Sequence, residues 1–132
     1  MRQPQAGVFL SPCISKLEAQ RPPNISPMST DSIKNLQQSL IEFSNARDWE
    51  KFHSPKNLTM ALSVEVAELM EHFQWMTEDD SRKLQDQTLA EVKEEVADVL
   101  LYLLQICNQL NIDPIEAAQK KLLKNAVKYP AP

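Results

Sequence analysis

The chain has 132 residues, of which 42% are hydrophobic and 24% are charged, and its formal net charge is −4. This length suits one domain, and the hydrophobic and charged fractions argue against a disordered chain. The negative net charge argues against a protein that neutralises duplex-DNA phosphates with clustered basic residues. A single glycine and 6% aromatic residues disfavour a turn-rich β-sandwich, so the composition predicts an all-α domain. The two cysteines, Cys13 and Cys107, have no CxxC or CxxH spacing, which favours a reduced cytoplasmic protein over a zinc site.

The first part of the chain differs in composition from the rest. Residues 1–27 contain five of the nine prolines and the only glycine, which predicts a disordered tail or an upstream extension. The globular domain is therefore expected over residues 28–132. Its first helix is predicted from Thr30, because apolar residues recur there at spacings of three and four, namely Ile33, Leu36, Leu40 and Phe43.

Pro55 interrupts the helical pattern, and a second helix is predicted over Leu58–Trp75, apolar on nearly every side. A polar connection follows, with room for one short helical turn. Thr88 and Glu91 have the spacing of a capping box, which predicts a third helix from Leu89 to about Gln109.

The last helix has the clearest start. Asp113 is predicted as its N-cap, Pro114 occupies the first helical position, and Pro130 ends it. Four helices of these lengths form a thin bundle, so the fold is expected to complete its core by self-association.

Two pairs of acids interrupt the second and third helices. Glu65 and Glu68 are three residues apart, as are Glu95 and Asp98, so each pair projects from one helical face. Either pair alone is more typical of a solvated surface. Both helices are apolar on most sides, however, so the acids are not expected to lie on a wide polar face. If the two helices pack antiparallel, the four carboxylates would meet between them. Since such crowding raises carboxyl pKa values unless a cation neutralises the charge, the pattern predicts a metal site.

The ligand type indicates the metal. Carboxylates without imidazole or thiolate suit Mg²⁺, with Mn²⁺ as the other candidate. A di-iron bundle requires Glu-x-x-His, but Glu71 stands three residues after Glu68 and His72 misses that register. Iron is therefore the minor alternative.

Four stretches in this order resemble the MazG-like, all-α nucleoside triphosphate pyrophosphohydrolases, and in particular their dCTP pyrophosphatase branch: RDWEKFHSPKNL, EVAELMEHFQW, EEVADVLLYLL and NAVKYP. The resemblance covers about residues 28–130. It implies a four-helix bundle that forms a homodimer, or a dimer of dimers, and that hydrolyses a nucleoside triphosphate to the monophosphate and pyrophosphate. It also implies that Glu65, Glu68, Glu95 and Asp98 bind Mg²⁺. Beside them, Glu71 and Glu94 are candidates for positioning the attacking water or a second metal ion.

The resemblance also indicates substrate contacts. Trp49, Trp75 and Tyr102 match the aromatic positions that enclose the base in dCTP-type relatives, although each alone is more typical of core packing. His53 matches the WxxFH stretch, where a loop role and a substrate contact are both open. Asn125 and Lys128 match the NxxxYP ending and are candidate phosphate ligands; Lys121 and Lys124 more simply complement the helix dipole. Some deoxycytidine-specific relatives carry a histidine where this chain has Leu40, which leaves the preferred base open.

The leading hypothesis is thus a Mg²⁺-dependent pyrophosphohydrolase acting on dCTP or other dNTPs in nucleotide-pool house-cleaning, without a nucleic acid polymer or membrane as partner. One alternative is an all-α dUTPase-like enzyme that also accepts diphosphates. Another is a non-catalytic helical interaction module, in which the acids are surface and the aromatic residues are core.

Overall fold

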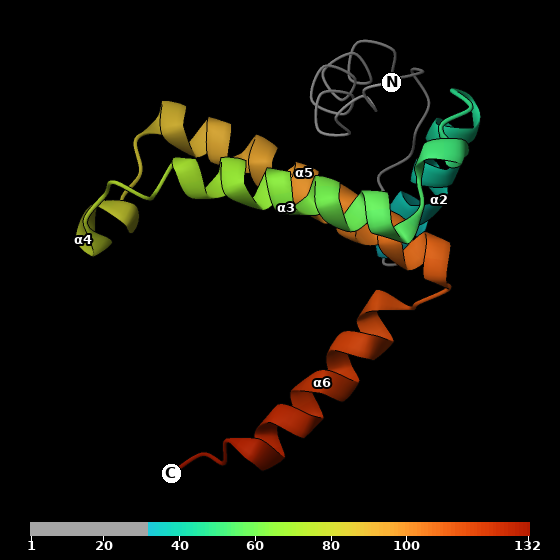
Figure 1. Ribbon diagram of the computed structural model, residues 1–132. Helices are drawn as coiled ribbons and strands as arrows, with labels where there is room; N and C mark the ends of the chain where they lie inside the picture. Colours follow the sequence, from blue (N-terminus) through green and yellow to red (C-terminus); the bar gives the residue numbers. More distant parts are fainter. Residues whose placement is uncertain (1–31) are drawn as a thin grey trace.

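The computed structural model describes residues 32–132, and over that range it contains helices and no strand (Figure 1). The prediction of an all-α protein is confirmed. The predictions for residues 1–27 and for a helix start at Thr30 lie outside the described residues. The elements in chain order are α2 (Ser32–Asn45), the 3-10 turn η2 (Glu50–Phe52), α3 (Pro55–Glu71), α4 (Glu78–Ser81), α5 (Asp86–Leu110) and α6 (Pro114–Lys128).

The core lies between α3 and α5, which run side by side in opposite directions, with α2 against one end of the pair (Figure 1). Leu58 and Ala61 of α3 pack on Tyr102 of α5, and all three are buried. Partly buried apolar residues complete this cluster, namely Phe43, Trp49, Leu62 and Ile106. Residues 58, 61, 62 and 65 of α3 lie on one helical stripe, so the same face that buries the core continues into the acids.

Helix α3 differs from its predicted range at both ends. It begins at Pro55, because the Ser54 side chain caps it by accepting a hydrogen bond from the Asn57 amide at 3.2 Å. Proline at the first helical position starts a helix rather than breaking it, since its missing N–H has no helical partner there. The helix ends at Glu71 and not at Trp75. Residues 72–76 form successive turns instead, in which the Phe73 and Gln74 amides both donate to the Met70 carbonyl.

Helix α5 begins one turn before its predicted start, so the expected capping box at Thr88 is wrong. Gln85 is the N-cap, without a side-chain cap, and its carbonyl accepts from the Leu89 amide at 2.8 Å. Asp86 in the first turn stabilises this earlier start, because a negative charge is favourable at a helix N-terminus. At the other end Asn111 adopts a left-handed conformation with φ 52°, which ends the helix at Leu110.

Helix α6 confirms its predicted start, since the Asp113 side chain accepts from the Ile115 and Glu116 amides at 3.0 Å each. It projects away from the α3 and α5 pair (Figure 1), and none of its residues is buried. Leu122, Leu123 and Val127 are all largely exposed. Within residues 32–132, no helix has both the length and the hydropathy that a membrane span requires.

Candidate metal and nucleotide site

Three carboxylates meet between α3 and α5. One oxygen each from Glu65, Glu95 and Asp98 lies within 4.8 Å of the other two. Glu65 is 0% exposed and Asp98 is 3% exposed, although both are acids. Neither oxygen of Glu65 accepts a hydrogen bond within residues 32–132 when the acids are ionised, and Glu68 becomes its hydrogen-bond partner only when one of the two acids carries a proton. A fully buried carboxylate in this condition carries a large desolvation cost, and a bound cation would offset it.

Burial and the neighbouring acids also raise the pKa values of carboxyl groups in this cluster. Burial raises the pKa of Glu65 to about 8, with further contributions from Glu68, Asp98 and Glu95. Burial also raises the pKa of Glu95, and the charges of Glu68 and Asp98 add to the effect. Side-chain hydrogen bonds with Glu68 contribute to both increases, so Glu68 lies in contact with Glu65 and Glu95. The donor set is all oxygen and fits a hard divalent cation such as Mg²⁺ or Mn²⁺.

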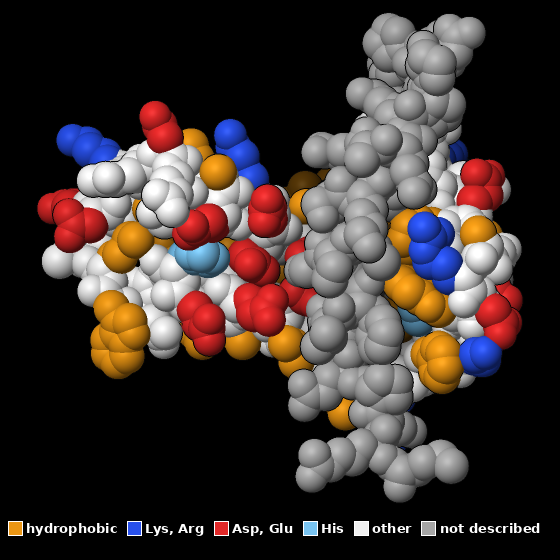
Figure 2. Space-filling model, turned by 90° about the horizontal axis from the view of Figure 1, so that it is seen from above, with side chains coloured by type: hydrophobic (Ala, Val, Ile, Leu, Met, Phe, Trp, Pro, Cys, Tyr) orange, Lys and Arg blue, Asp and Glu red, His pale blue; other side chains and the backbone are white. Residues whose placement is uncertain are grey.

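A histidine next to the acids was missed by the sequence analysis as a member of the site. His72 Nδ1 lies 3.8 Å from Glu91 Oε2, and its Nε2 lies 4.0 Å from Glu95 Oε1. Figure 2 shows acidic side chains gathered around one histidine side chain on this face of the molecule. The signal was present in the spacing: His72 stands four residues after Glu68 and Glu91 four before Glu95, so antiparallel helices bring these positions together one turn further along.

Tyr102 connects the acids to the core. It is 2% exposed, and burial raises its pKa, with the charges of Glu65, Asp98 and Glu68 acting in the same direction. On α5 the positions Glu95, Asp98, Tyr102 and Gln105 follow spacings of three, four and three, which places them on one face. That face runs from the carboxylates, through the buried tyrosine, toward the segment that carries Trp49.

Trp49 and His53 lie together at the end of α2, in a segment folded by local contacts. Asp48 adopts a left-handed conformation with φ 54°, which an aspartate tolerates, and the Trp49 amide then donates to the Ser44 carbonyl at 3.1 Å. The Trp49 ring contacts Phe43 at a centroid distance of 5.6 Å and His53 at 6.3 Å, both edge to face. Trp49 thus packs against the core and keeps part of its side chain exposed, and its contact with a base stays a prediction.

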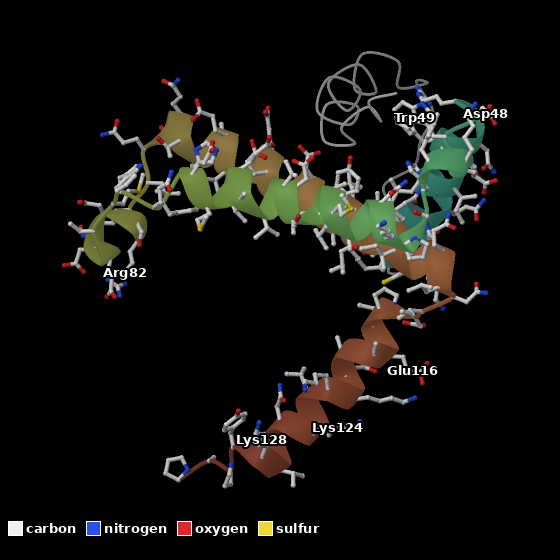
Figure 3. All side chains as sticks on the ribbon, viewed as in Figure 1. Asp48, Trp49, Arg82, Glu116, Lys124 and Lys128 are labelled. Carbon is white, nitrogen blue, oxygen red and sulfur yellow. The ribbon has the colours of Figure 1, made fainter. Side chains whose placement is uncertain are left out.

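Other predicted site residues lie outside the group of three carboxylates. Trp75 is 90% exposed and lies in the turns that follow the C-terminal end of α3. Trp49 precedes the other end of that helix. Asn125 and Lys128 lie on the projecting α6, and Figure 3 shows Lys128 far from Trp49. Glu71 and Glu94 flank the cluster on α3 and α5, and both are exposed.

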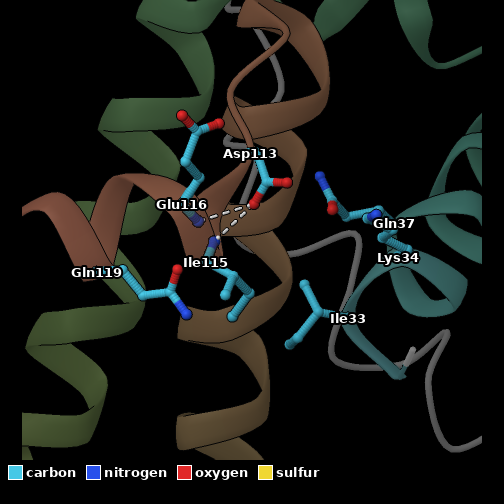
Figure 4. A pocket seen from close by; sticks show the side chains of 7 residues that line it. All are labelled: Ile33, Lys34, Gln37, Asp113, Ile115, Glu116 and Gln119. Atoms are coloured by element: carbon cyan, nitrogen blue, oxygen red, sulfur yellow. Dashed lines mark hydrogen bonds between the residues drawn. The ribbon is translucent and has the colours of Figure 1, made fainter. Parts of the chain in front are cut away.

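A hollow between the starts of α2 and α6 is separate from the carboxylate cluster (Figure 4). The Asp113 carboxylate at its edge is engaged in capping α6. It contains none of the clustered carboxylates and neither tryptophan. Its lining consists of Ile33, Lys34, Gln37, Asp113, Ile115, Glu116 and Gln119.

Comparison with known proteins identifies the family to which this all-α chain belongs. A sequence model of the MazG-like family matches residues 60–132, and the chain belongs to that family. The matched range includes all of Glu65, Glu68, Glu95 and Asp98, whereas Trp49 and His53 precede it.

Individual relatives give a closer comparison. The chain is 38% identical over 114 residues to mouse (Mus musculus) dCTP pyrophosphatase 1, covering 85% of this chain and 66% of the relative. It is 36% identical over 110 residues to the human (Homo sapiens) protein of that name, covering 82% of this chain and 64% of the relative. The chain therefore spans slightly less than two thirds of these relatives' length. A crystal structure of a pyrophosphatase from Archaeoglobus fulgidus is similar with a TM-score of 0.73 and 43% identity, covering 82% of this chain and 100% of that one.

Proposed function

We propose that the protein hydrolyses nucleoside triphosphates, with dCTP or another dNTP as substrate, to the monophosphate and pyrophosphate in a Mg²⁺-dependent reaction of cytoplasmic nucleotide-pool house-cleaning. The observation that carries this proposal is the fully buried side chain of Glu65 beside Glu95 and Asp98, whose ionised carboxylate accepts no hydrogen bond within residues 32–132. The dCTP pyrophosphatase relatives and the archaeal pyrophosphatase structure support the same reaction class.

Glu65, Glu95 and Asp98 would hold the cation, with Glu68 beside them as the fourth acid. A bound Mg²⁺ supplies charge neutralisation for the phosphate oxygens and the leaving group. In the reaction a water oxygen bonds to the α-phosphorus, the bond from that phosphorus to the bridging oxygen breaks, and pyrophosphate leaves. A carboxylate that accepts the water proton assists this step, and Glu71 and Glu94 flank the cluster on its two helices for that role.

The aromatic segment would receive the base. Trp49 offers a partly exposed ring for stacking, a contact of roughly 1 to 3 kcal/mol in single-strand binders. Tyr102 lies between this ring and the acids, buried, so it would shape the floor of the site rather than stack freely. Phosphate and base would thus bind at two ends of one face of α5.

A second copy of the chain would complete the site. On α5, Val96, Leu100 and Leu103 form a stripe of exposed apolar side chains at helical spacing, and Met60 and Val64 are exposed on α3. Stripes of this kind are typical of an interface between subunits. Because Trp75, Asn125 and Lys128 lie away from the carboxylates of their own chain, we infer that they serve the site of a partner chain in a homodimer or homotetramer.

Leu103→Lys tests the assembly. We expect the native chain to sediment as a dimer or tetramer and the variant to shift to the monomer, since a lysine in an apolar interface is strongly unfavourable. Gln38→Lys on the exposed side of α2 is the control and should leave the sedimentation profile unchanged. A native chain that remains monomeric at high concentration would contradict the assembly.

A substrate panel tests the reaction. We expect pyrophosphate and a monophosphate from at least one of dCTP, the other canonical dNTPs and modified dNTPs in the presence of Mg²⁺, and loss of activity with a chelator. Release of orthophosphate from a deoxynucleoside diphosphate would favour the dUTPase-like alternative instead. No product from any nucleotide would favour the interaction module. Because Leu40 replaces the histidine of some deoxycytidine-specific relatives, the panel also measures base preference directly.

A further inference from the structure

Gln105 of α5 lies one turn beyond Tyr102 and is 6% exposed. Its side chain joins three elements of the fold. The Nε2 atom donates to Ser44 Oγ of α2 at 2.9 Å and lies 3.0 Å from Nδ1 of His53. The Oε1 atom accepts from Asn108 Nδ2 at 3.2 Å. The buried amide therefore has a partner at each of its positions, which fixes its orientation.

A backbone carbonyl fixes the direction of the whole chain of hydrogen bonds. Asn108 Nδ2 donates to the Gln37 backbone oxygen at 3.2 Å, and a carbonyl oxygen only accepts. That end of Asn108 is therefore its NH₂ group, and the Gln105 atom facing it must be the oxygen. It follows that Gln105 presents its NH₂ group to Ser44 and His53.

The direction of these bonds determines the histidine tautomer. If an NH₂ group faces His53 Nδ1, that nitrogen accepts, and the ring proton of the neutral imidazole resides on Nε2. Burial lowers the pKa of His53, and the opposing charge of Glu50 is the smaller influence. The ring is thus neutral at physiological pH, with one donor position. Within residues 32–132, Nε2 makes no hydrogen bond or ion pair, so this donor is available.

We propose that Gln105 is a positioning residue that holds His53 as the neutral Nε2–H tautomer, and that this N–H donates to an acceptor atom of the nucleobase beside Trp49. The inference rests on the proposed function for the identity of the ligand. Its support is placement: the His53 and Trp49 rings are 6.3 Å apart, and Gln105 lies seven residues from Asp98. Seven residues of helix span about 10 Å, comparable to the reach from phosphate to base in one nucleotide.

The tautomer can be measured on the wild-type protein without any substitution. Nitrogen-15 NMR of the imidazole distinguishes Nε2–H from Nδ1–H, and the only other histidine of the chain is His72. We expect His53 to show a protonated Nε2 and an acceptor Nδ1 at neutral pH. A proton on Nδ1 would overturn the inference.

Gln105→Glu tests the positioning role. A carboxylate accepts from Nδ1–H, so the pKa of His53 should rise by at least about one unit, and its neutral form should carry the proton on Nδ1. The KM for dCTP should then rise a few-fold to about tenfold at alkaline pH, where the Nε2 donor is lost, with kcat little changed. At acidic pH, where the ring is protonated on both nitrogens, the variant should match the wild type. Gln109→Glu is the matched control on the exposed side of α5 and should change neither property.

Ligand titration separates this inference from the reaction. Adding dCMP without metal should shift the His53 Nε2–H signal, whereas deoxyribose 5-phosphate, which lacks the base, should not. Equal shifts with both ligands, no shift with dCMP, or a KM increase that does not depend on pH would each overturn the role of His53. If no dNTP is hydrolysed, the proposed function fails, while the tautomer and the dCMP titration still decide this inference.

Discussion

Glu95→Gln is expected to lower Mg²⁺-dependent pyrophosphate release by roughly a hundredfold to a thousandfold. The substitution keeps the size of the side chain but removes one of the three carboxylates that lie within 4.8 Å of each other. A metal ion at such a centre contributes several kcal/mol of charge stabilisation in the transition state, and each 1.36 kcal/mol corresponds to about a tenfold change in rate. The measurement is kcat and KM for the best dNTP of the panel over a range of Mg²⁺ concentrations.

The control for this substitution is Glu42→Gln on the exposed side of α2, which removes one negative charge at a distance from the cluster. It should leave kcat unchanged. Because Glu95 also lies 4.0 Å from His72, the variant should be checked for native helicity before the kinetics are interpreted. Undiminished activity of a folded Glu95→Gln protein would contradict the metal assignment.

The second large effect concerns stability in the absence of metal. The folded protein raises the pKa of Glu65 from its ordinary 4.5 to about 8, and that of Glu95 in the same direction. Between these pKa values the native state binds more protons than the unfolded state, so the free energy of unfolding falls as pH rises. The stabilisation is complete below about pH 4.5 and lost as pH passes through about 8. The loss amounts to a few kcal/mol, since one pKa unit corresponds to about 1.4 kcal/mol.

Urea unfolding in a chelator, at several values between about pH 5 and pH 8, measures this slope. Glu65→Gln imitates the protonated side chain, so we expect it to flatten the slope and to be more stable than the metal-free wild type at alkaline pH. Mg²⁺ should restore stability to the wild type at alkaline pH and do so much less for the variant. The exposed control Glu42→Gln should keep the wild-type slope. A metal-free wild type that gains stability with rising pH would be inconsistent with a buried, uncompensated acid.

Helix existence followed from the sequence, whereas several helix boundaries did not. Asp113 and Pro114 specify the start of α6 by local chemistry alone, and the structure has it there. Ser54 and Pro55 carried the same type of signal, but proline was read as a break. Thr88 had the spacing of a cap and stands inside α5, because Gln85 and Asp86 allow one more turn. A boundary depends on competition between nearby caps, which a single motif does not resolve.

The candidate site was predictable where it depends on helical periodicity. Residues 65 and 68 lie on one face of their helix, and residues 95 and 98 lie on one face of theirs. An antiparallel arrangement of the two helices then brings these two faces together. The Glu-x-x-His spacing concerns residues of one helix and therefore does not predict a role for His72. Its contacts with Glu91 and Glu95 are made between two helices. The Gln105 contact with His53 spans 52 positions, and no local pattern specifies such a pairing.

In the proposed assembly, the projecting α6 would make the protein sensitive to dilution. Its apolar residues Leu122, Leu123 and Val127 are largely exposed in the described part of the chain, so in the proposed assembly this helix would be buried only when two chains associate. Free energy gained in that way depends on protomer concentration, unlike the packing of α3 on α5. If Asn125 and Lys128 serve a partner's site, then specific activity itself would fall on dilution, before any loss of helical structure in the α3 and α5 pair.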